Sequence, residues 1–200
     1  MITSRRTFFT ACRLIFFPNF SFGENITTPR QSEGPFYPKI IPEDNDNNLV
    51  KNGKNQMESG GNILNLFGLV INPNSNPLEG LTVEIWQTDK NGVYRHSGSI
   101  RWKNRDNQFQ GFGRTISDMN GKFYFRTIIP VEYPGRTPHI HLKIWNRNKN
   151  ILTTQFYIHG HPLNIDDFIF NKMTREEKKL NSMKIIKMSS EFKTNITLVV

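Results

Sequence analysis

The stretch GRTISDMNGKFYFRTIIPVEYPGRTPHIHLKIW, residues 113–145, decides the fold of this chain. Its last eight residues, 138–145, alternate two histidines and a lysine with Ile, Leu and Ile, which is typical of a β-strand with one apolar face. Earlier in the stretch, Asp-Met-Asn-Gly at 118–121 separates two runs of strand composition and indicates a hairpin turn. The stretch and the residue before it therefore predict strands at residues 112–117, 122–127 and 138–145.

The same pattern continues on the N-terminal and C-terminal sides of this stretch. GLTVEIWQ (80–87) alternates Leu, Val and Ile with Thr, Glu and Trp, and Asn-Gly at the tip of the turn 89–92 again indicates a hairpin. Short strands between turns that contain Gly, Asn and Pro are typical of an all-β sandwich. We expect an antiparallel β-sandwich with long loops, whose further strands are residues 62–71, 80–87, 152–158 and 196–200.

Two segments of the chain are predicted to be irregular and one to be helical. TPRQSEGPFYP (28–38) contains three prolines and a glycine, which favour an extended arm, and the Asn- and Asp-rich residues 41–61 predict a long loop. The one predicted helix is C-terminal and spans residues 174–189. Thr174 and Glu177 have the spacing of a capping box at its start.

The first 25 residues are treated apart from the fold. SRRTFF (4–9) resembles the start of a twin-arginine export signal, but Arg13 and Pro18 interrupt the apolar stretch that follows. Two interpretations stay open, namely a twin-arginine-type signal that exports the protein to the periplasm, or a disordered extension of a cytoplasmic protein. In either case we exclude residues 1–25 and assign residues 26–200 to a single domain.

Composition and charge exclude several classes of function. The 200-residue chain has a formal net charge of +9, of which +3 falls in residues 1–30 and +4 in residues 172–193. The nearly neutral middle has no basic block interleaved with aromatic residues, which argues against a nucleic-acid partner. No apolar run reaches the roughly 18 residues that a membrane-spanning helix needs. Cys12, the single cysteine, lies in the excluded segment, so a metal ion would need His, Tyr or carboxylate ligands.

His139 and His141 are the first candidates for metal ligands. Period two places both imidazoles on one face of a strand, roughly 6–7 Å apart along it, so both can bind one metal ion. On its own, however, such a pair is weak evidence for a metal site and favours surface or core histidines. His159 and His161 form a second pair, but the glycine between them and the proline after them predict a turn, and we interpret them as loop histidines.

Tyr94 and Tyr133 are the next candidates. Tyr94 follows the Asn-Gly turn, and Tyr133 lies six positions before His139. A tyrosine in a β-protein is most often a buried ring with a hydrogen-bonded hydroxyl. Ligation by a phenolate requires a hard, strongly Lewis-acidic ion such as Fe(III), which lowers the phenol pKa from about 10.

Three stretches together resemble the intradiol ring-cleavage dioxygenases, which are non-haem Fe(III) enzymes that open catechols. They are VEIWQTDKNGVYRH (83–96), residues 113–145 quoted above, and LTTQFYIHGHP (152–162). The arm 28–38 is similar to the N-terminal arm of that family. Because no long helical segment precedes the first strand, the chain is more similar to the iron-bearing subunit of protocatechuate 3,4-dioxygenase than to the dimeric catechol dioxygenases.

This resemblance implies a set of site residues. The iron ligands of the family fall on Tyr94, Tyr133, His139 and His141. Tyr133 would also act as a base when it leaves the metal. Arg136 and Gln155 match an arginine and a glutamine of the family's active site, with Arg136 stabilising negative charge on the substrate ring. An alternative role for Arg136 is a salt bridge with Glu132. In the similar branch the arm lies near a neighbouring active site, so Pro35, Phe36 and Tyr37 are candidates for a pocket wall.

The resemblance implies a dioxygenase that inserts O2 into the intradiol bond of a catechol, of the protocatechuate type, to give a cis,cis-muconate diacid. It also implies an oligomer, formed with copies of this chain or with a related subunit. Two alternatives stay open. One is a non-catalytic, transthyretin-like β-sandwich that binds a ligand, and the other is a dioxygenase subunit without iron.

Overall fold

A computed structural model describes residues 26–53, 58–96, 98 and 102–200 of the chain. Residues 1–25 lie outside this part, and with them the export-signal interpretation, the boundary at residue 25 and Cys12. Residues 97 and 99–101, in the loop that precedes the 112–117 strand, also lie outside it. Within the described residues, none of the helices combines the length and the apolar character needed to cross a membrane.

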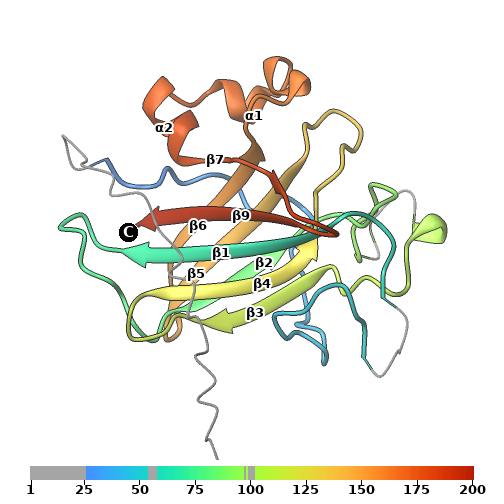
Figure 1. Ribbon diagram of the computed structural model, residues 1–200, viewed down its shortest axis with the longest axis horizontal. Helices are drawn as coiled ribbons and strands as arrows, with labels where there is room; N and C mark the ends of the chain where they lie inside the picture. The colour runs from blue at the N-terminus through green and yellow to red at the C-terminus, as the bar shows by residue number, and fades with distance from the viewer. Residues whose placement is uncertain (1–25, 54–57, 97, 99–101) are drawn as a thin grey trace, which may run out of the picture.

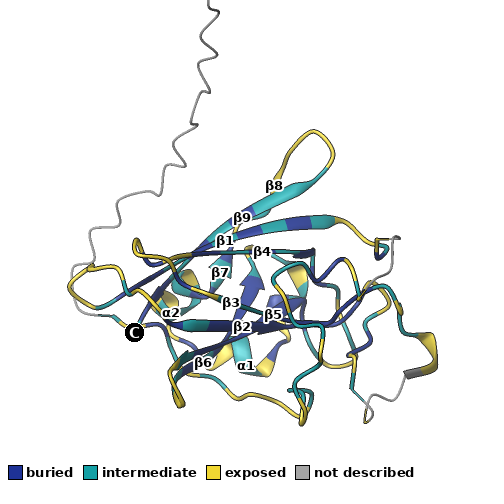
Figure 2. Cartoon of the chain, turned by 90° about the horizontal axis from the view of Figure 1, so that it is seen from below, coloured by how far each residue is buried: buried dark blue, intermediate teal, exposed yellow. Residues whose placement is uncertain are grey.

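In the described part of the chain, nine strands form two sheets that lie against each other as layers (Figures 1 and 2). One sheet has the order β4-β1-β9-β8 and the other the order β3-β2-β5-β6-β7. The prediction of an all-β fold is therefore confirmed. The strands are β1 (Ile63–Ile71), β2 (Thr82–Trp86), β3 (Phe112–Ile116), β4 (Lys122–Ile128), β5 (His139–Asn146), β6 (Lys149–Ile158), β7 (Ser182–Met183), β8 (Ile186–Lys187) and β9 (Phe192–Val199).

The sheets are mixed, so the prediction of purely antiparallel pairing is wrong in two places. β9 pairs with β1 in parallel, and β7 pairs with β6 in parallel. The cause is the path of the chain after β6. It forms β7 at the edge of the second sheet, crosses to β8 in the first sheet, and returns so that β9 runs beside β1 in the same direction. The closing strand is also longer than the predicted residues 196–200.

The helix predicted over residues 174–189 is much shorter in the structure. Helix α2 (Arg175–Leu180) begins with the predicted capping box, because Thr174 and Glu177 exchange side-chain and backbone hydrogen bonds. It ends at Leu180, and Met183 lies fully buried in β7 opposite Ile158. Pairing with the sheet edge thus replaces the last turns of the expected helix. The described residues also form the short helices η1 (Trp102–Asn104), η2 (Pro162–Ile165) and α1 (Phe168–Asn171).

The main core lies between the two sheets. On β5, Ile140, Leu142 and Ile144 point into it and are at most 1% exposed. On the facing sheet, Gly68 of β1 leaves room for the ring of Phe123, because a Cβ at this glycine would lie 1.9 Å from the ring. The apolar face of β5 therefore follows the alternation in the sequence, and its other face points away from the core.

Residues 45–49, in the predicted loop, cover one edge of each sheet. Arg114 N of β3 donates to Asn45 O at 2.7 Å, and Arg126 N of β4 donates to Asn47 O at 2.8 Å. Leu49 then enters the main core and is fully buried. One edge strand of each sheet, β3 and β4, is thus covered by a segment of the same chain.

Candidate metal centre

The outward face of β5 carries His139 and His141 side by side. Both side chains are buried, with 3% and 2% of their surface exposed, and their ring centroids are 4.8 Å apart. The two Nε2 atoms point toward each other at 3.2 Å. The alternation in the sequence therefore places both imidazoles on one face, as predicted, and the rings converge more closely than their spacing along the strand.

Hydrogen bonding and burial fix the state of these histidines. The Nδ1 atom of His139 lies 2.6 Å from Thr137 O, so it must carry the proton and donate it, which leaves a lone pair on Nε2. Burial lowers the pKa of His139 to about 3, and the nearby Arg136 adds to the effect. Burial, His139 and Arg136 together hold the pKa of His141 well below 6.5. Both rings are neutral near pH 7, the form that binds a metal ion.

Two loops bring the phenols of Tyr94 and Tyr133 to the same place. Asp89 Oδ1 accepts from the backbone N atoms of Asn91 and Val93 and so holds the turn before Tyr94. Gly92 in this turn has φ +71°, and a Cβ there would lie 2.7 Å from Glu132 O. Only glycine lets the two loops pack this closely, because the φ is left-handed and the space is filled by backbone.

The four rings form a closed circuit of contacts. The ring centroids of Tyr94 and Tyr133 are 5.4 Å apart, and those of Tyr133 and His139 are 5.5 Å apart. His141 completes the circuit, at 4.8 Å from His139 and 6.0 Å from Tyr94. The structure thus brings together all four residues that the resemblance selected, from strand β5 and from two separate loops.

The two phenols differ in exposure. Tyr94 is 3% exposed, and its hydroxyl has no hydrogen-bond partner of ordinary geometry within the described part of the chain. Burial, with the neighbouring Tyr133 phenol, raises the pKa of Tyr94 well above 10. Tyr133 is half-buried and lines a cavity of about 670 Å³ that opens between the 90–92 and 131–137 loops. A ligand in this cavity therefore meets Tyr133 and not Tyr94.

These residues fit a ferric ion. Two nitrogens bound at about 2.1 Å and at right angles would be about 3.0 Å apart, close to the 3.2 Å between the histidine Nε2 atoms. The unpartnered Tyr94 hydroxyl is a buried oxygen that such an ion would satisfy. Among the described residues no three His, Cys, Asp or Glu side chains cluster, so any metal ion here depends on the phenols. A set of two phenolates and two imidazoles suits a hard trivalent cation.

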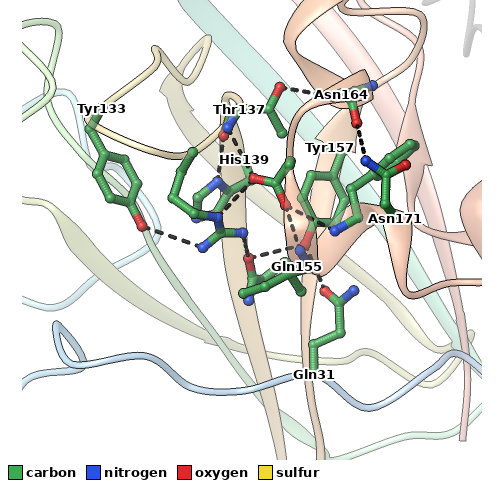
Figure 3. A network of polar contacts seen from close by, with 12 residues as sticks. Gln31, Tyr133, Thr137, His139, Gln155, Tyr157, Asn164 and Asn171 are labelled. Carbon is green, nitrogen blue, oxygen red and sulfur yellow. Dashed lines mark hydrogen bonds and ion pairs between the residues drawn. The ribbon is translucent and has the colours of Figure 1, made fainter.

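Arg136 and Gln155 contact this group of residues, and Figure 3 shows Gln155 in the same network as Tyr133 and His139. Arg136 Nη2 donates to Gln155 Oε1 at 2.6 Å, and Nη1 donates to the Tyr133 hydroxyl at 3.4 Å. Gln155 comes from β6, directly opposite His141. The alternative partner of Arg136, Glu132, is not the one that the structure shows. Instead, Arg136 Nε donates to Asp167 Oδ2 at 2.8 Å.

Sequence reasoning missed Asp167. This carboxylate is 1% exposed, accepts from the backbone N of Thr137 at 3.0 Å, and caps helix α1 through Ile169 N and Phe170 N. It therefore ties Arg136 and the start of β5 to α1. The signal was an Asp before an apolar run, which is a usual helix start, but the helix that follows is only four residues long.

The N-terminal arm covers the site of its own chain. Phe36 stacks on Tyr94 with ring centroids 4.5 Å apart, and Gln155 Nε2 donates to Ser32 O at 3.1 Å. Gln31 accepts from the hydroxyl of Tyr157, the residue opposite His139 (Figure 3). The three candidates for a pocket wall, Pro35, Phe36 and Tyr37, thus belong to a segment that closes the outer face of β5 and β6.

The second histidine pair takes no part in the circuit of rings. His159 and His161 lie in the turn after β6, as predicted. His161 caps η2 and lies 3.4 Å from the hydroxyl of Thr137.

Comparisons with known proteins agree with this fold. A sequence model of the family described as Dioxygenase matches residues 32–197. Catechol 1,2-dioxygenase 1 of Acinetobacter lwoffii is 32% identical over 168 residues, which are 75% of this chain and 51% of that protein. The beta chain of protocatechuate 3,4-dioxygenase of Burkholderia cepacia is 33% identical, over 62% of this chain and 57% of that one.

A solved structure is also similar. The dioxygenase domain of a dioxygenase and carbohydrate-binding protein fusion from Streptomyces sp. SirexAA-E is 29% identical, with a TM-score of 0.69, over 88% of this chain and 98% of that one. The chain therefore belongs to the intradiol ring-cleavage dioxygenase family. It spans about half the length of the curated catechol and protocatechuate dioxygenases that it matches.

Proposed function

We propose that this chain is a non-haem Fe(III) dioxygenase that cleaves a catechol between its two hydroxyl-bearing carbons. Both atoms of O2 enter the product, a cis,cis-muconate diacid. The observation that carries the proposal is the closed circuit of Tyr94, Tyr133, His139 and His141, with two Nε2 atoms 3.2 Å apart. The names of the relatives, catechol and protocatechuate dioxygenases, support the same reaction.

The four residues of the circuit would hold the ferric ion. When bound, this ion supplies Lewis acidity, which lowers the pKa values of the phenols and of the catechol. We assign the proton-accepting role to the Oη atom of Tyr133, because it is half-buried and lines the cavity. Tyr94 stays in place, since it is buried under Phe36.

Arg136 would stabilise negative charge on the ring as the catechol loses its protons. Its guanidinium is held on two sides, by Asp167 at Nε and by Gln155 at Nη2, so its orientation is set before the substrate arrives. Gln155 thereby orients Arg136 and need not touch the ring. The arm excludes water from the opposite side of Tyr94 through the stacked ring of Phe36.

The substituent on the ring is a finer part of the proposal. The sequence favours a carboxylated, protocatechuate-like catechol, and two cations, Lys90 and Arg136, line the cavity in support of it. Each of the two cations also has a carboxylate partner, Asp167 for Arg136 at 2.8 Å and Asp106 for Lys90 at 3.6 Å, so a ring carboxylate would compete with these partners. The proposal also keeps the expected assembly into oligomers, with copies of this chain or with a related subunit.

Reconstitution with iron tests the proposed function. We expect one iron per chain, a broad visible absorption band from phenolate-to-iron charge transfer, and oxygen uptake with catechol, protocatechuate or hydroxyquinol. Tyr133→Phe should shift the band and slow turnover, whereas His139→Ala should abolish iron binding. A colourless protein without iron after reconstitution would instead favour a subunit without iron or a binding module.

A further inference from the structure

The outer face of the second sheet continues beyond the histidines with charged residues that are buried. Register places Trp86 of β2 opposite His141 of β5, and Glu84 opposite Lys143. Glu84 is fully buried and Lys143 is 4% exposed. Charged side chains are seldom this buried without a partner, so the partners of this pair indicate what the face is built to hold.

These charges hold the arm through Tyr37. The Tyr37 hydroxyl donates to Glu84 Oε2 at 2.9 Å, and the ammonium of Lys143 lies 3.5 Å from the centroid of the Tyr37 ring. Lys143 also pairs with Glu33, which belongs to the arm. The remaining positions of the Glu84 carboxylate accept from Arg114 Nε at 2.9 Å and Trp145 Nε1 at 2.7 Å. The Tyr37 ring is thus held by a hydrogen bond at its hydroxyl and by a cation–π contact on its face.

Tyr37 in turn supports the ring beside His141. It meets Trp86 edge to face, with centroids 5.0 Å apart and an angle of 75°. Trp86 stacks in parallel on His141, with centroids 4.7 Å apart and an angle of 10°. Tyr37, Trp86 and His141 therefore form a continuous series of ring contacts, here called the stack, from the arm to the candidate metal centre.

His141 differs from His139 in how its ring is held. A histidine that binds a metal ion is usually oriented by a hydrogen bond from its other ring nitrogen, as His139 is by Thr137 O. The Nδ1 atom of His141 is buried and has no such partner among the described residues. The rings of His139 and Tyr94 meet His141 at steep angles, whereas the indole of Trp86 lies parallel to the imidazole and can therefore fix its plane.

We propose that Tyr37 is a positioning residue for His141, which acts by pressing Trp86 against the imidazole, and that Glu84 and Lys143 hold Tyr37 in place. The role of His141 as a metal ligand rests on the proposed function. The stack itself does not, and it can be measured in the protein without metal.

The first experiment measures the NMR chemical shift of His141 in metal-free protein whose histidines carry an isotope label. The Cε1 proton of His141, assigned by its loss in His141→Asn, should be displaced upfield by the ring current of Trp86. Tyr37→Leu should move this resonance by several tenths of a ppm and broaden it, while Tyr37→Phe, which keeps the ring, should leave most of the displacement. Tyr124→Leu is the matched control, since Tyr124 is a half-buried tyrosine with one side-chain hydrogen bond, to Asn65 in the other sheet.

The second experiment measures iron affinity of the same variants. Loss of a group that orients a metal-ligating histidine typically weakens metal binding by about 10- to 100-fold, and we expect this for Tyr37→Leu. Tyr37→Phe should restore most of the affinity, and Tyr124→Leu should bind as the unaltered protein does. Lys143→Met should lie between the two Tyr37 variants. A far-UV spectrum with unchanged β content shows that each variant is folded.

The outcomes separate this proposal from the proposed function. An unchanged His141 resonance in Tyr37→Leu overturns the positioning role, whatever the protein does with iron. A Tyr37→Leu variant whose His141 resonance moves but whose iron affinity is unchanged also overturns the positioning role. Failure of the unaltered protein to bind iron overturns both the proposed function and the ligand role of His141. A Tyr37→Leu variant in which the His141 resonance moves and iron binding is weakened supports the proposal.

Discussion

Gly92 determines, at the scale of single residues, how closely the two phenols of the site approach. Its φ of +71° and the Glu132 carbonyl 2.7 Å from where a Cβ would lie leave no room for a side chain. The loop of Tyr94 and the loop of Tyr133 meet at this point. The spacing of the two phenols therefore depends on the absence of a methyl group.

Gly92→Ala should separate the loops and weaken iron binding by at least tenfold, because the clash is with backbone. Gly80→Ala is the matched control, since Gly80 also has a left-handed φ, of +73°, but nothing within 4 Å of the added Cβ. Both variants should lose about 1–2 kcal/mol from the left-handed backbone. Iron titration and urea unfolding measure the two effects, and equal iron affinity in both variants would contradict the role of Gly92.

Asp167 links pH to stability through Arg136. Burial alone would raise the pKa of this carboxyl, but the hydrogen bonds from Arg136 and from backbone N atoms outweigh it and hold the pKa below 3.8. Because the folded pKa is lower than the unfolded one, the carboxylate stabilises the fold above about pH 4. This contribution is lost as pH falls through the folded pKa.

Asp167→Asn should lower the free energy of unfolding at pH 7 by about 3 kcal/mol, since the change leaves the guanidinium of Arg136 without its anion. Below pH 4, the stability of the variant should also fall less steeply than that of the unaltered protein. Asp166→Asn, at the exposed neighbouring position, serves as the control and should change little. Urea unfolding from pH 7 to pH 2 gives both values, and parallel pH profiles for Asp167→Asn and the unaltered protein would argue against this linkage.

At the scale of elements, β5 serves the core with one face and the site with the other. Leu142 points into the main core and is fully buried, while His141 beside it belongs to the site. Leu142→Ala should therefore cost about 3 kcal/mol of stability and leave the iron absorption band in place. His141→Asn should remove iron binding at little cost to the fold of the metal-free protein. Thermal unfolding measures stability and iron titration measures iron binding. A variant that lost both stability and iron binding to a similar degree would disprove this division between the two faces of β5.

Sequence patterns predicted β5 well because its alternation is strict and both faces are used. They predicted the start of α2 through Thr174 and Glu177, since a capping box is local. They failed at its end, because Met183 is apolar in either a helix or a strand, and the choice depends on pairing with Ile158 of β6. Such pairing is set by tertiary contacts, which no local pattern contains.

At the scale of the whole molecule, the candidate site lies on the outer face of the second sheet, under the N-terminal arm. It belongs to a small aromatic cluster around Trp86, Tyr94 and Phe112 that is separate from the main core. The resemblance selected all six residues of the site from the sequence. It did not give Asp167 or the stack from Tyr37 to His141, because both arise where distant segments meet.

Anomalous diffraction at the iron edge, from crystals of the iron-loaded chain, tests the central claim most directly. The account predicts one strong peak within about 2.3 Å of the Nε2 atoms of His139 and His141 and of the hydroxyl oxygens of Tyr94 and Tyr133. A peak elsewhere, or one bound by the histidines while both tyrosines point away, would contradict it.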